Sequence, residues 1–280
     1  MDNILAGKIQ NAKLTKVQEK IAKYFLKNQG RIGSMSSMEA AKEIGVSDAS
    51  IIRFARAIGY SGFSELKEDF YNSLVENAYS DLSLSERMDQ SREQYPSEEM
   101  STQYLDLMQQ NLIKTFQNNP QESYESVAAG LIAARKRFVI GLRGCKGAAM
   151  QFSRLLSFML PEVTCLLDSE CTSINMLQDV GEQDAVLMFA FARYYKIDVE
   201  YLKLAKEKKA KIYLVTDEFI NPLASYADIT LLADTDHMSF FNSALGAVTI
   251  GEYLLTLISR KVDFQDRIQR RDAITAYQRL

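Results

Sequence analysis

The spacing of apolar residues along the chain changes character near residue 137. Before that point apolar positions repeat at helical spacing, as at Leu14, Val17, Ile21 and Phe25, and lysines fill the other faces of that helix. From Arg137 onwards short continuous apolar runs alternate with helical stretches, which is typical of a parallel sheet covered on both faces. The runs are residues 138–140, 163–167, 185–190, 212–215 and 229–232. We therefore predict an all-α amino-terminal domain followed by an α/β domain with a mostly parallel five-stranded sheet.

A polar stretch separates the two parts. Residues 77–100 are rich in Ser, Glu, Asp and Arg, and the helical pattern resumes from Ser101 to Lys136 with a break at Pro120. We predict a helical domain over residues 1–76, a linker over 77–100 and an α/β domain over 101–280.

The segment from Ser37 to Arg56 fits a helix-turn-helix position by position. Ala41 is small enough for two helices to approach closely, and Gly45 stands where the turn requires a positive φ. Ser47 is placed to cap the second helix by accepting from its first free N–H groups. The predicted shared core of the two helices is Ile44, Val46, Ile51, Phe54, Ala55 and Ile58.

The opposite face of the second helix is where a recognition helix meets the major groove of DNA. Ser50 and Arg53 are candidates for base edges, and Arg56 and Lys67 for phosphates. The alternative is a helical hairpin used only for packing. Asp48 favours this alternative, because the phosphates of DNA repel a carboxylate. The predicted DNA-binding residues are Ser37, Ser47, Ala49, Ser50, Ile52, Arg53, Arg56 and Lys67.

Charge is distributed unevenly along the chain. The net formal charge is −3, but residues 1–75 contain 11 basic and 8 acidic residues, and the remainder contains 22 basic and 28 acidic residues. A basic amino-terminal part on an acidic body favours a polyanionic partner for the first part alone.

The stretch from Leu14 to Lys67 resembles the amino-terminal domain of the RpiR/MurR family of transcription regulators, most specifically in the segment AIGYSGFSELK from Ala57 to Lys67. Members of that family join this domain to a carboxy-terminal sugar isomerase (SIS) domain. The resemblance extends over nearly the whole chain. It implies a DNA-binding regulator with a SIS-like α/β domain, in agreement with the fold that the apolar pattern predicts.

The turn after the first apolar run is a candidate anion site. A glycine-containing strand-to-helix turn exposes free N–H groups at the positive end of a helix, and two cations stand in this one. The alternative is a turn whose glycines serve packing alone. The candidate ligand residues here are Gly141, Arg143, Gly144, Cys145 and Lys146.

The resemblance implies a second site in the turn after the third run, where phosphosugar-binding SIS domains usually have a Ser-x-Ser-Gly-x-Thr loop. Here Arg193 and two tyrosines replace those hydroxyls, so the family's phosphate residues do not carry over. We expect Arg193 and Tyr194 to bind an anion. The alternative is that Arg193 pairs within a dimer interface. Ser239 and Ser243 either touch a ligand or cap the apolar helix that we predict from Phe240 to Leu257.

These features predict a transcription regulator whose affinity for a double-stranded operator is controlled by a small anion, a sugar phosphate or a related compound. The alternatives are a sugar-phosphate isomerase and a regulator whose SIS-like domain only dimerises. A single histidine, His237, and the missing P-loop motif argue against an enzyme, so we predict no catalytic residue, metal or cofactor. The three cysteines form no CxxC pair and any disulfide would leave one over, which, with no membrane-length apolar run, predicts a cytoplasmic protein without membrane contact. Because a helix-turn-helix reads paired half-sites through symmetry, we predict a homodimer or tetramer.

Overall fold

The computed structural model describes residues 8–9, 12, 14–27, 36–67, 69, 84–95, 100–219 and 221–276. The contacts between residues divide the chain into two compact units. The first comprises Met1–Asp81 with Phe219–Ser225, and the second comprises Leu82–Glu218 with Tyr226–Leu280.

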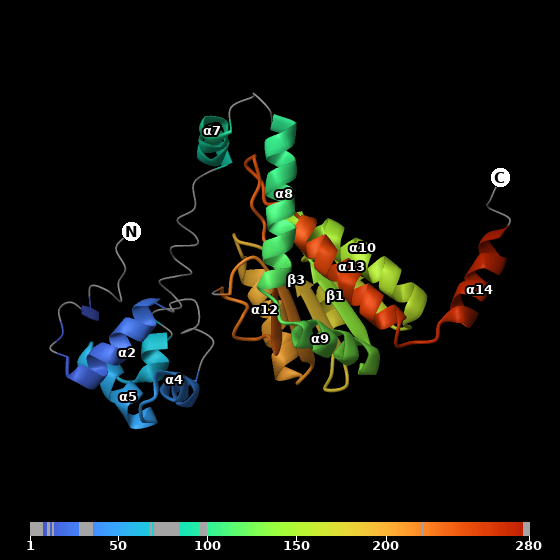
Figure 1. The fold of residues 1–280 in the computed structure, drawn as a ribbon. Coiled ribbons are helices and arrows are strands. Elements are labelled where there is room, and N and C mark those ends of the chain that lie inside the picture. The colour runs from blue at the N-terminus through green and yellow to red at the C-terminus, as the bar shows by residue number, and fades with distance from the viewer. Residues whose placement is uncertain are drawn as a thin grey trace. The chain divides into compact units, whose positions relative to one another are not determined.

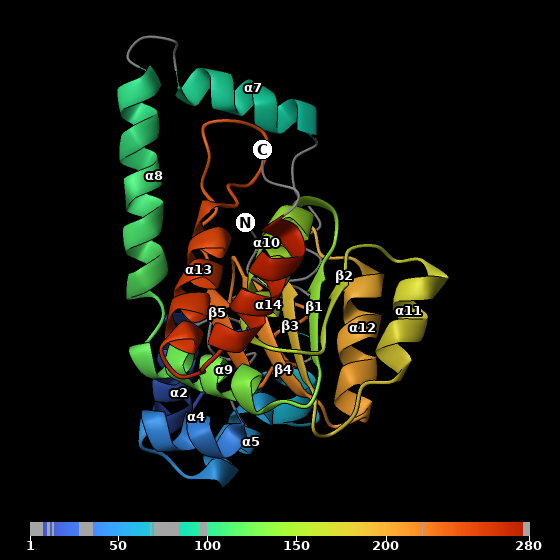
Figure 2. The ribbon, with the colours of Figure 1, turned by 90° about the vertical axis from the view of Figure 1, so that its right-hand side faces the viewer.

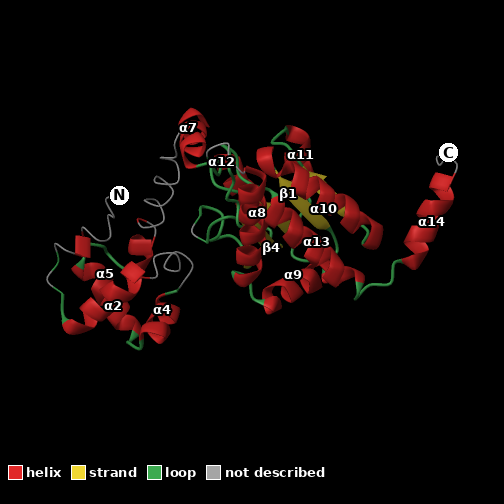
Figure 3. Ribbon diagram, turned by 45° about the horizontal axis from the view of Figure 1, so that its top comes forward, coloured by secondary structure: helices red, strands yellow, loops and turns green. Residues whose placement is uncertain are grey.

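The described secondary structure of the first unit is helical, in agreement with the predicted all-α domain (Figure 3). Its labelled helices are α2 (Lys16–Lys27), α4 (Ser37–Ile44) and α5 (Asp48–Ala57). Phe25 from α2 packs edge-on against Phe54 from α5, with 5.6 Å between ring centroids. Both rings are fully buried, and each such side chain contributes about 1.5–3 kcal/mol of hydrophobic stabilisation.

A parallel sheet of five strands, β2-β1-β3-β4-β5, forms the centre of the second unit. Every strand pair is parallel, which confirms the predicted fold class. Strands β1 and β3 are buried along their whole length, as their continuous apolar runs predict. The strands are β1 (Arg137–Gly141), β2 (Val163–Leu166), β3 (Ala185–Phe189), β4 (Lys211–Thr216) and β5 (Ile229–Leu232).

Helices cover both faces of this sheet. α9, α10 and α13 lie over one face and α11 and α12 over the other, and α8 packs beside α13 (Figures 1 and 2). The described helices of this unit are α7 (Leu84–Gln94), α8 (Met100–Gln117), α9 (Gln121–Ala133), η1 (Arg143–Cys145), α10 (Lys146–Met159), α11 (Cys171–Gln178), α12 (Lys196–Glu207), α13 (Leu245–Ser259) and α14 (Gln265–Thr275).

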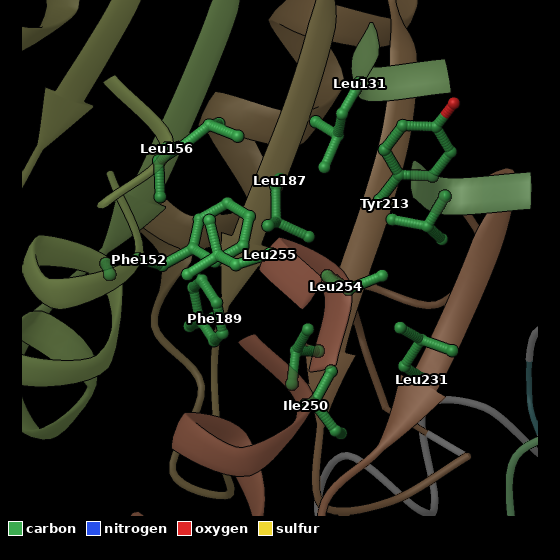
Figure 4. Close-up of a cluster of buried hydrophobic side chains, with 14 of the residues drawn as sticks. Leu131, Phe152, Leu156, Leu187, Phe189, Tyr213, Leu231, Ile250, Leu254 and Leu255 are labelled. Carbon is green, nitrogen blue, oxygen red and sulfur yellow. The ribbon is translucent and has the colours of Figure 1, made fainter. Parts of the chain in front are cut away.

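The main core lies between the sheet and the α9–α10–α13 layer (Figure 4). Phe152 from α10 and Phe189 from β3 are both almost fully buried, with ring centroids 5.9 Å apart. Ile250 and Leu254 from α13 reach the same cluster. Because Phe189 ends its strand, this packing fixes the position of the turn that follows β3.

One element boundary differs from the sequence prediction, and one helix lies within the predicted linker. The apolar helix expected from Phe240 begins only at Leu245, because the Ser243 hydroxyl accepts from the Leu245 N–H at 3.2 Å and the residues before it form a loop. Within the expected linker, residues 84–94 form helix α7, which belongs to the second unit. The domain limits 1–76, 77–100 and 101–280 stay predictions.

None of the helices in the described ranges is both long enough and apolar enough to cross a membrane.

Candidate functional site

The turn between α4 and α5 has the predicted geometry. Gly45 adopts φ +70°, and the N–H of Val46 donates to the Ala41 carbonyl at 2.9 Å. Ser47 caps α5, its hydroxyl accepting from the N–H of Ser50 at 3.3 Å. A left-handed glycine followed by a capping serine fixes the angle between the two helices.

Helix α5 divides into a buried and an exposed face. Ile51, Phe54 and Ala55 are completely buried. Ala49, Arg53 and Arg56 are exposed. The predicted recognition face therefore remains open while the other face anchors the helix.

Polar contacts order the exposed face of α5. Arg53 Nη2 donates to Ser50 Oγ at 3.2 Å, and Ser50 Oγ lies 2.8 Å from Ser47 Oγ. Arg56 Nε donates to the carbonyl of Ser61 at 3.0 Å, which leaves the rest of its guanidinium at the surface. One carboxylate oxygen of Asp48 is covered by protein, so this oxygen is withdrawn from the exposed face.

The other predicted DNA residues surround this face less closely. Ile52 and Lys67 are half-buried. Ser37, also half-buried, is the first residue of α4, and the cap of that helix is the preceding Ser36. Contact of these residues with DNA stays a prediction.

In the second unit a cavity of about 350 Å³ opens where the turns after β1 and β3 meet. In a sheet of this strand order the chain reverses direction between β1 and β3, and ligands bind at the carboxyl ends of the strands at that point. The lining residues are Leu142, Arg143, Gly144, Cys145, Phe189, Ala190, Phe191, Ala192, Arg193, Tyr195, Asp198, Phe240, Phe241 and Asn242.

Two arginines of the cavity differ in their partners. Arg143 Nη1 lies 3.7 Å from Asp198 Oδ2, and the Arg143 guanidinium stacks on the Tyr195 ring at 3.0 Å from the centroid. In the described part of the chain no hydrogen bond or ion pair reaches the guanidinium of Arg193. Both arginines have a positive φ, +49° for Arg143 and +71° for Arg193.

Such left-handed backbone costs about 1–3 kcal/mol per non-glycine residue and clusters at functional sites. The fold thus holds two cations at the cavity on left-handed backbone, a conformation that Glu162 and Lys209 also adopt in turns outside the cavity.

Burial shifts the pKa values of the acidic groups around the cavity. It raises the pKa of Asp198, against the opposing effect of the Tyr195 N–H and Arg143. Burial also raises the pKa of the Cys145 thiol to about 12, so this thiol is protonated at neutral pH.

Behind the cavity, Asp217 holds the turn after β3 in place. Its carboxylate accepts from the Ala192 N–H at 2.9 Å and from the Tyr194 hydroxyl at 2.7 Å. Burial raises the pKa of Asp217 as well.

The structure brings Arg143, Gly144, Cys145 and Arg193 together in the cavity. Five other candidates do not line it. Tyr194 is buried and points its hydroxyl at Thr216 and Asp217, whereas its neighbour Tyr195 faces the cavity. A Cβ at Gly141 would lie 2.5 Å from the Ala149 Cβ, so this glycine serves the packing of β1 on α10.

The remaining three candidates have other surroundings. Lys146 is exposed on α10, outside the cavity lining. Ser243 is buried and satisfies the first N–H of α13, and Ser239 is half-buried beside the lining residues.

Sequence reasoning missed most of the cavity walls. Tyr195 and Asp198 carried a usable signal, because the Asp198 carboxylate accepts from the Tyr195 N–H at 2.8 Å in a capping box that places both at the start of α12. Phe240, Phe241 and Asn242 come from an irregular loop with no such signal.

Within the described residues no group of three or more His, Cys, Asp or Glu side chains is arranged to hold a metal ion.

A helix-turn-helix unit joined to a parallel α/β unit with a cavity at its switch point is the arrangement expected of a ligand-binding transcriptional regulator. Residues 4–86 match the model of the rpiR-family helix-turn-helix domain, and residues 130–257 match the model of the SIS domain. The chain therefore carries an amino-terminal helix-turn-helix domain of the rpiR family and a carboxy-terminal SIS domain.

Two curated relatives are similar over most of their length. An uncharacterized HTH-type transcriptional regulator of Haemophilus influenzae is 25% identical over 251 residues, which are 88% of this chain and 84% of the relative. Another, of Caldanaerobacter subterraneus subsp. tengcongensis, is 26% identical over 258 residues, 90% of this chain and 88% of the relative.

Two solved structures share the fold. The sugar isomerase domain of an RpiR transcription factor from Sphaerobacter thermophilus superimposes with a TM-score of 0.60 at 21% identity, covering 63% of this chain and 99% of that one. The Vibrio vulnificus NanR protein complexed with ManNAc-6P superimposes with a TM-score of 0.52 at 16% identity, covering 99% of both chains.

Proposed function

We propose that this protein binds an operator through α5 and that a small anion in the SIS-domain cavity controls its affinity for that operator. The observation that carries the proposal is the cavity at the β1–β3 switch point, lined by two arginines of which only Arg143 has a partner. An unpaired guanidinium in a half-enclosed site favours a negatively charged ligand. The ManNAc-6P bound to NanR makes phosphorylated sugars the first anions to test.

Helix α7 offers a route from the cavity to the DNA-binding unit. Arg87 on α7 donates to the Phe240 carbonyl at 3.4 Å and to Asn242 Oδ1 at 3.3 Å. Ser91 donates to the Met238 carbonyl at 2.6 Å. Phe240 and Asn242 line the cavity, and α7 is the first described helix after the first unit along the chain. A ligand that moves the loop of residues 238–242 therefore acts directly on α7.

The proposal requires differential binding. A ligand shifts operator affinity only if it favours the arrangement of one state over the other. We propose that one state keeps the hydrogen bonds between α7 and the loop of residues 238–242 and that the other state breaks them.

We propose that the chain is not an isomerase. Aldose–ketose isomerisation needs a base that moves a proton between adjacent carbons. Among the described cavity-lining residues the carboxylate is Asp198, which already accepts from the Tyr195 N–H and pairs with Arg143. The sole histidine, His237, is outside that lining.

The test begins by selecting operator sequences from a random duplex pool with the full-length protein. Affinity for the selected duplex is then measured by fluorescence anisotropy with and without each of a panel of sugar phosphates and simpler anions. We expect at least one anion to change operator affinity, and the same anion to stabilise the protein in a thermal shift by about 2.7 kcal/mol at a hundred times its dissociation constant.

An anion that stabilises the protein but leaves operator affinity unchanged would overturn the regulatory half of the proposal. Turnover of a sugar phosphate would favour the isomerase instead. A panel without any binding anion would favour a SIS domain that only dimerises. The predicted homodimer or tetramer is checked on the same sample by sedimentation velocity.

A further inference from the structure

We propose that the cavity selects a monoanion with an apolar body, such as an aromatic carboxylate, over a phosphorylated sugar. This inference rests on the proposed function, because it names the class of anion that the cavity takes. It follows from three features of the cavity: its charge, its backbone amides and its walls.

The charge of the cavity suits a single negative charge. Arg143 and Asp198 lie 3.7 Å apart and compensate each other, which leaves Arg193 as the uncompensated cation among the described lining residues. A phosphomonoester carries about 1.5 to 2 negative charges at pH 7. A carboxylate carries one, and its two oxygens match the fork of a guanidinium.

Three backbone amides of the turns after β1 and β3 are already bonded within the protein. The N–H of Cys145 donates to the Leu142 carbonyl at 3.0 Å, and the N–H of Lys146 donates to the Arg143 carbonyl. In the second turn the Ala192 N–H donates to Asp217. These three N–H groups therefore have no free hydrogen to offer to a phosphate.

The walls are apolar rather than hydroxyl-binding. The floor consists of Leu142, Cys145, Phe189 and Ala190, all buried. At the mouth three aromatic rings keep a large exposed area: Tyr195 (45%), Phe240 (37%) and Phe241 (47%). An apolar ligand body removes that area from water, which is the main favourable term for such a site.

A sugar would find few partners for its hydroxyls. Among the described lining residues the polar side chains other than the arginines are Tyr195, Asp198 and Asn242. Asn242 already accepts from Arg87 and donates to Asp217, and Asp198 accepts from the Tyr195 N–H. Hydroxyls that are buried without a partner disfavour binding, so a polyol is discriminated against.

The experiment compares four probes in calorimetric titrations of the full-length protein: phenylacetate, its neutral amide phenylacetamide, N-acetylmannosamine 6-phosphate and inorganic phosphate. We expect phenylacetate to bind about tenfold or more tightly than each of the other three, since it alone combines one charge with an apolar body.

Substitutions at Arg193 test the role of the unpaired cation. Asparagine tolerates the left-handed backbone, so Arg193→Asn removes the charge without adding strain. We expect this variant to bind phenylacetate about tenfold more weakly, and Arg193→Lys to retain most of the affinity. The matched control is Arg154→Asn, which removes an exposed arginine of α10 outside the cavity and is expected to leave binding unchanged.

The outcomes separate this inference from the proposed function. Tighter binding of the phosphorylated sugar than of phenylacetate overturns the inference and leaves a ligand-controlled regulator standing. Equal binding of phenylacetate and its amide also overturns the inference, because charge would then contribute nothing. If no anion of the set or of the wider panel binds at millimolar concentration, the inference and the ligand half of the proposed function both fail.

Discussion

The exposed face of α5 and the cavity of the SIS domain both present arginines to negative charge, but they do so in opposite ways. Arg53 and Arg56 stand exposed on a regular helix, where water and salt screen them. Arg143 and Arg193 stand on left-handed backbone at a half-enclosed cavity, and one of them is already paired. The first arrangement suits a polyanion, whose many contacts add up, and the second suits one discrete anion.

The two surfaces also depend on the fold differently. The α5 face rests on a core drawn from one continuous stretch of about fifty residues, which includes Phe25 and Phe54. The cavity is built from the ends of two strands, the start of α12 and a loop before α13. Damage to one core should therefore leave the other surface functional.

The largest effect that tests this independence is expected from Phe54→Ala. Phe54 is fully buried against Phe25, and truncation of such a residue costs about 3–5 kcal/mol. We expect the helix-turn-helix unit to unfold at lower urea concentration and operator binding to be lost, while anion binding in the cavity persists. Val17→Ala, at an exposed position of α2, is the control and should leave both activities intact. Simultaneous loss of anion binding would show that the two units do not fold independently.

Arg53→Ala is expected to have the next largest effect. Arg53 is exposed on α5 and held by Ser50, so it is placed to read a base edge. Loss of such a contact costs about 1–3 kcal/mol of specific binding. The measurement is anisotropy with the selected duplex and with a scrambled duplex, and Lys23→Ala on α2 is the control. An equal loss on both duplexes would assign Arg53 to phosphate contact instead.

Asp198→Asn should have a smaller effect of opposite sign in the cavity. The substitution keeps an oxygen for the Tyr195 N–H but frees Arg143 from its partner at 3.7 Å. A partly exposed ion pair of this kind is worth up to about 1 kcal/mol, so we expect anion affinity to rise by up to roughly fivefold.

The pH dependence of anion affinity tests the same Arg143–Asp198 ion pair. Burial raises the pKa of Asp198, so its carboxyl takes up a proton in the folded protein at a higher pH than in the unfolded chain. Anion affinity should therefore rise as the pH falls through that pKa, and Asp198→Asn should reduce this rise. Because the pKa of Asp217 is raised too, an unchanged pH profile in the variant would assign the effect to Asp217.

The smallest expected effect concerns the cysteines. The Cys145 thiol is buried with a pKa of about 12, whereas Cys171 is exposed at the start of α11. Since the thiolate is the reactive form, iodoacetamide at pH 8 should modify Cys171 and spare Cys145. Peptide mass spectrometry reads out both sites, and rapid modification of Cys145 would mean that the floor of the cavity opens to solvent.

The helix-turn-helix was predictable because its determinants are local. Gly45 donates its N–H to the carbonyl of Ala41 four positions earlier, and Ser47 accepts from the N–H of Ser50 three positions later, so spacing alone reveals their roles. The parallel sheet was predictable from continuous apolar runs in the sequence, because strands such as β1 and β3 are buried along their whole length.

The cavity was predictable only where a turn directly follows a strand. Arg143 and Arg193 were found on that basis. The Tyr194 hydroxyl, however, bonds to Asp217 in the interior, and Tyr195 lines the cavity instead. Asn242 enters from an irregular loop that only the folded chain brings to the strand ends. Periodicity carries no information about such a loop.

The left-handed arginines have a consequence for evolution and engineering. At positions 143 and 193 glycine or asparagine fits the backbone with less strain, so replacing either arginine relieves a cost of about 1–3 kcal/mol. A screen for heat resistance is therefore expected to enrich these replacements, and under the proposed function the stabilised variants would bind the anion more weakly.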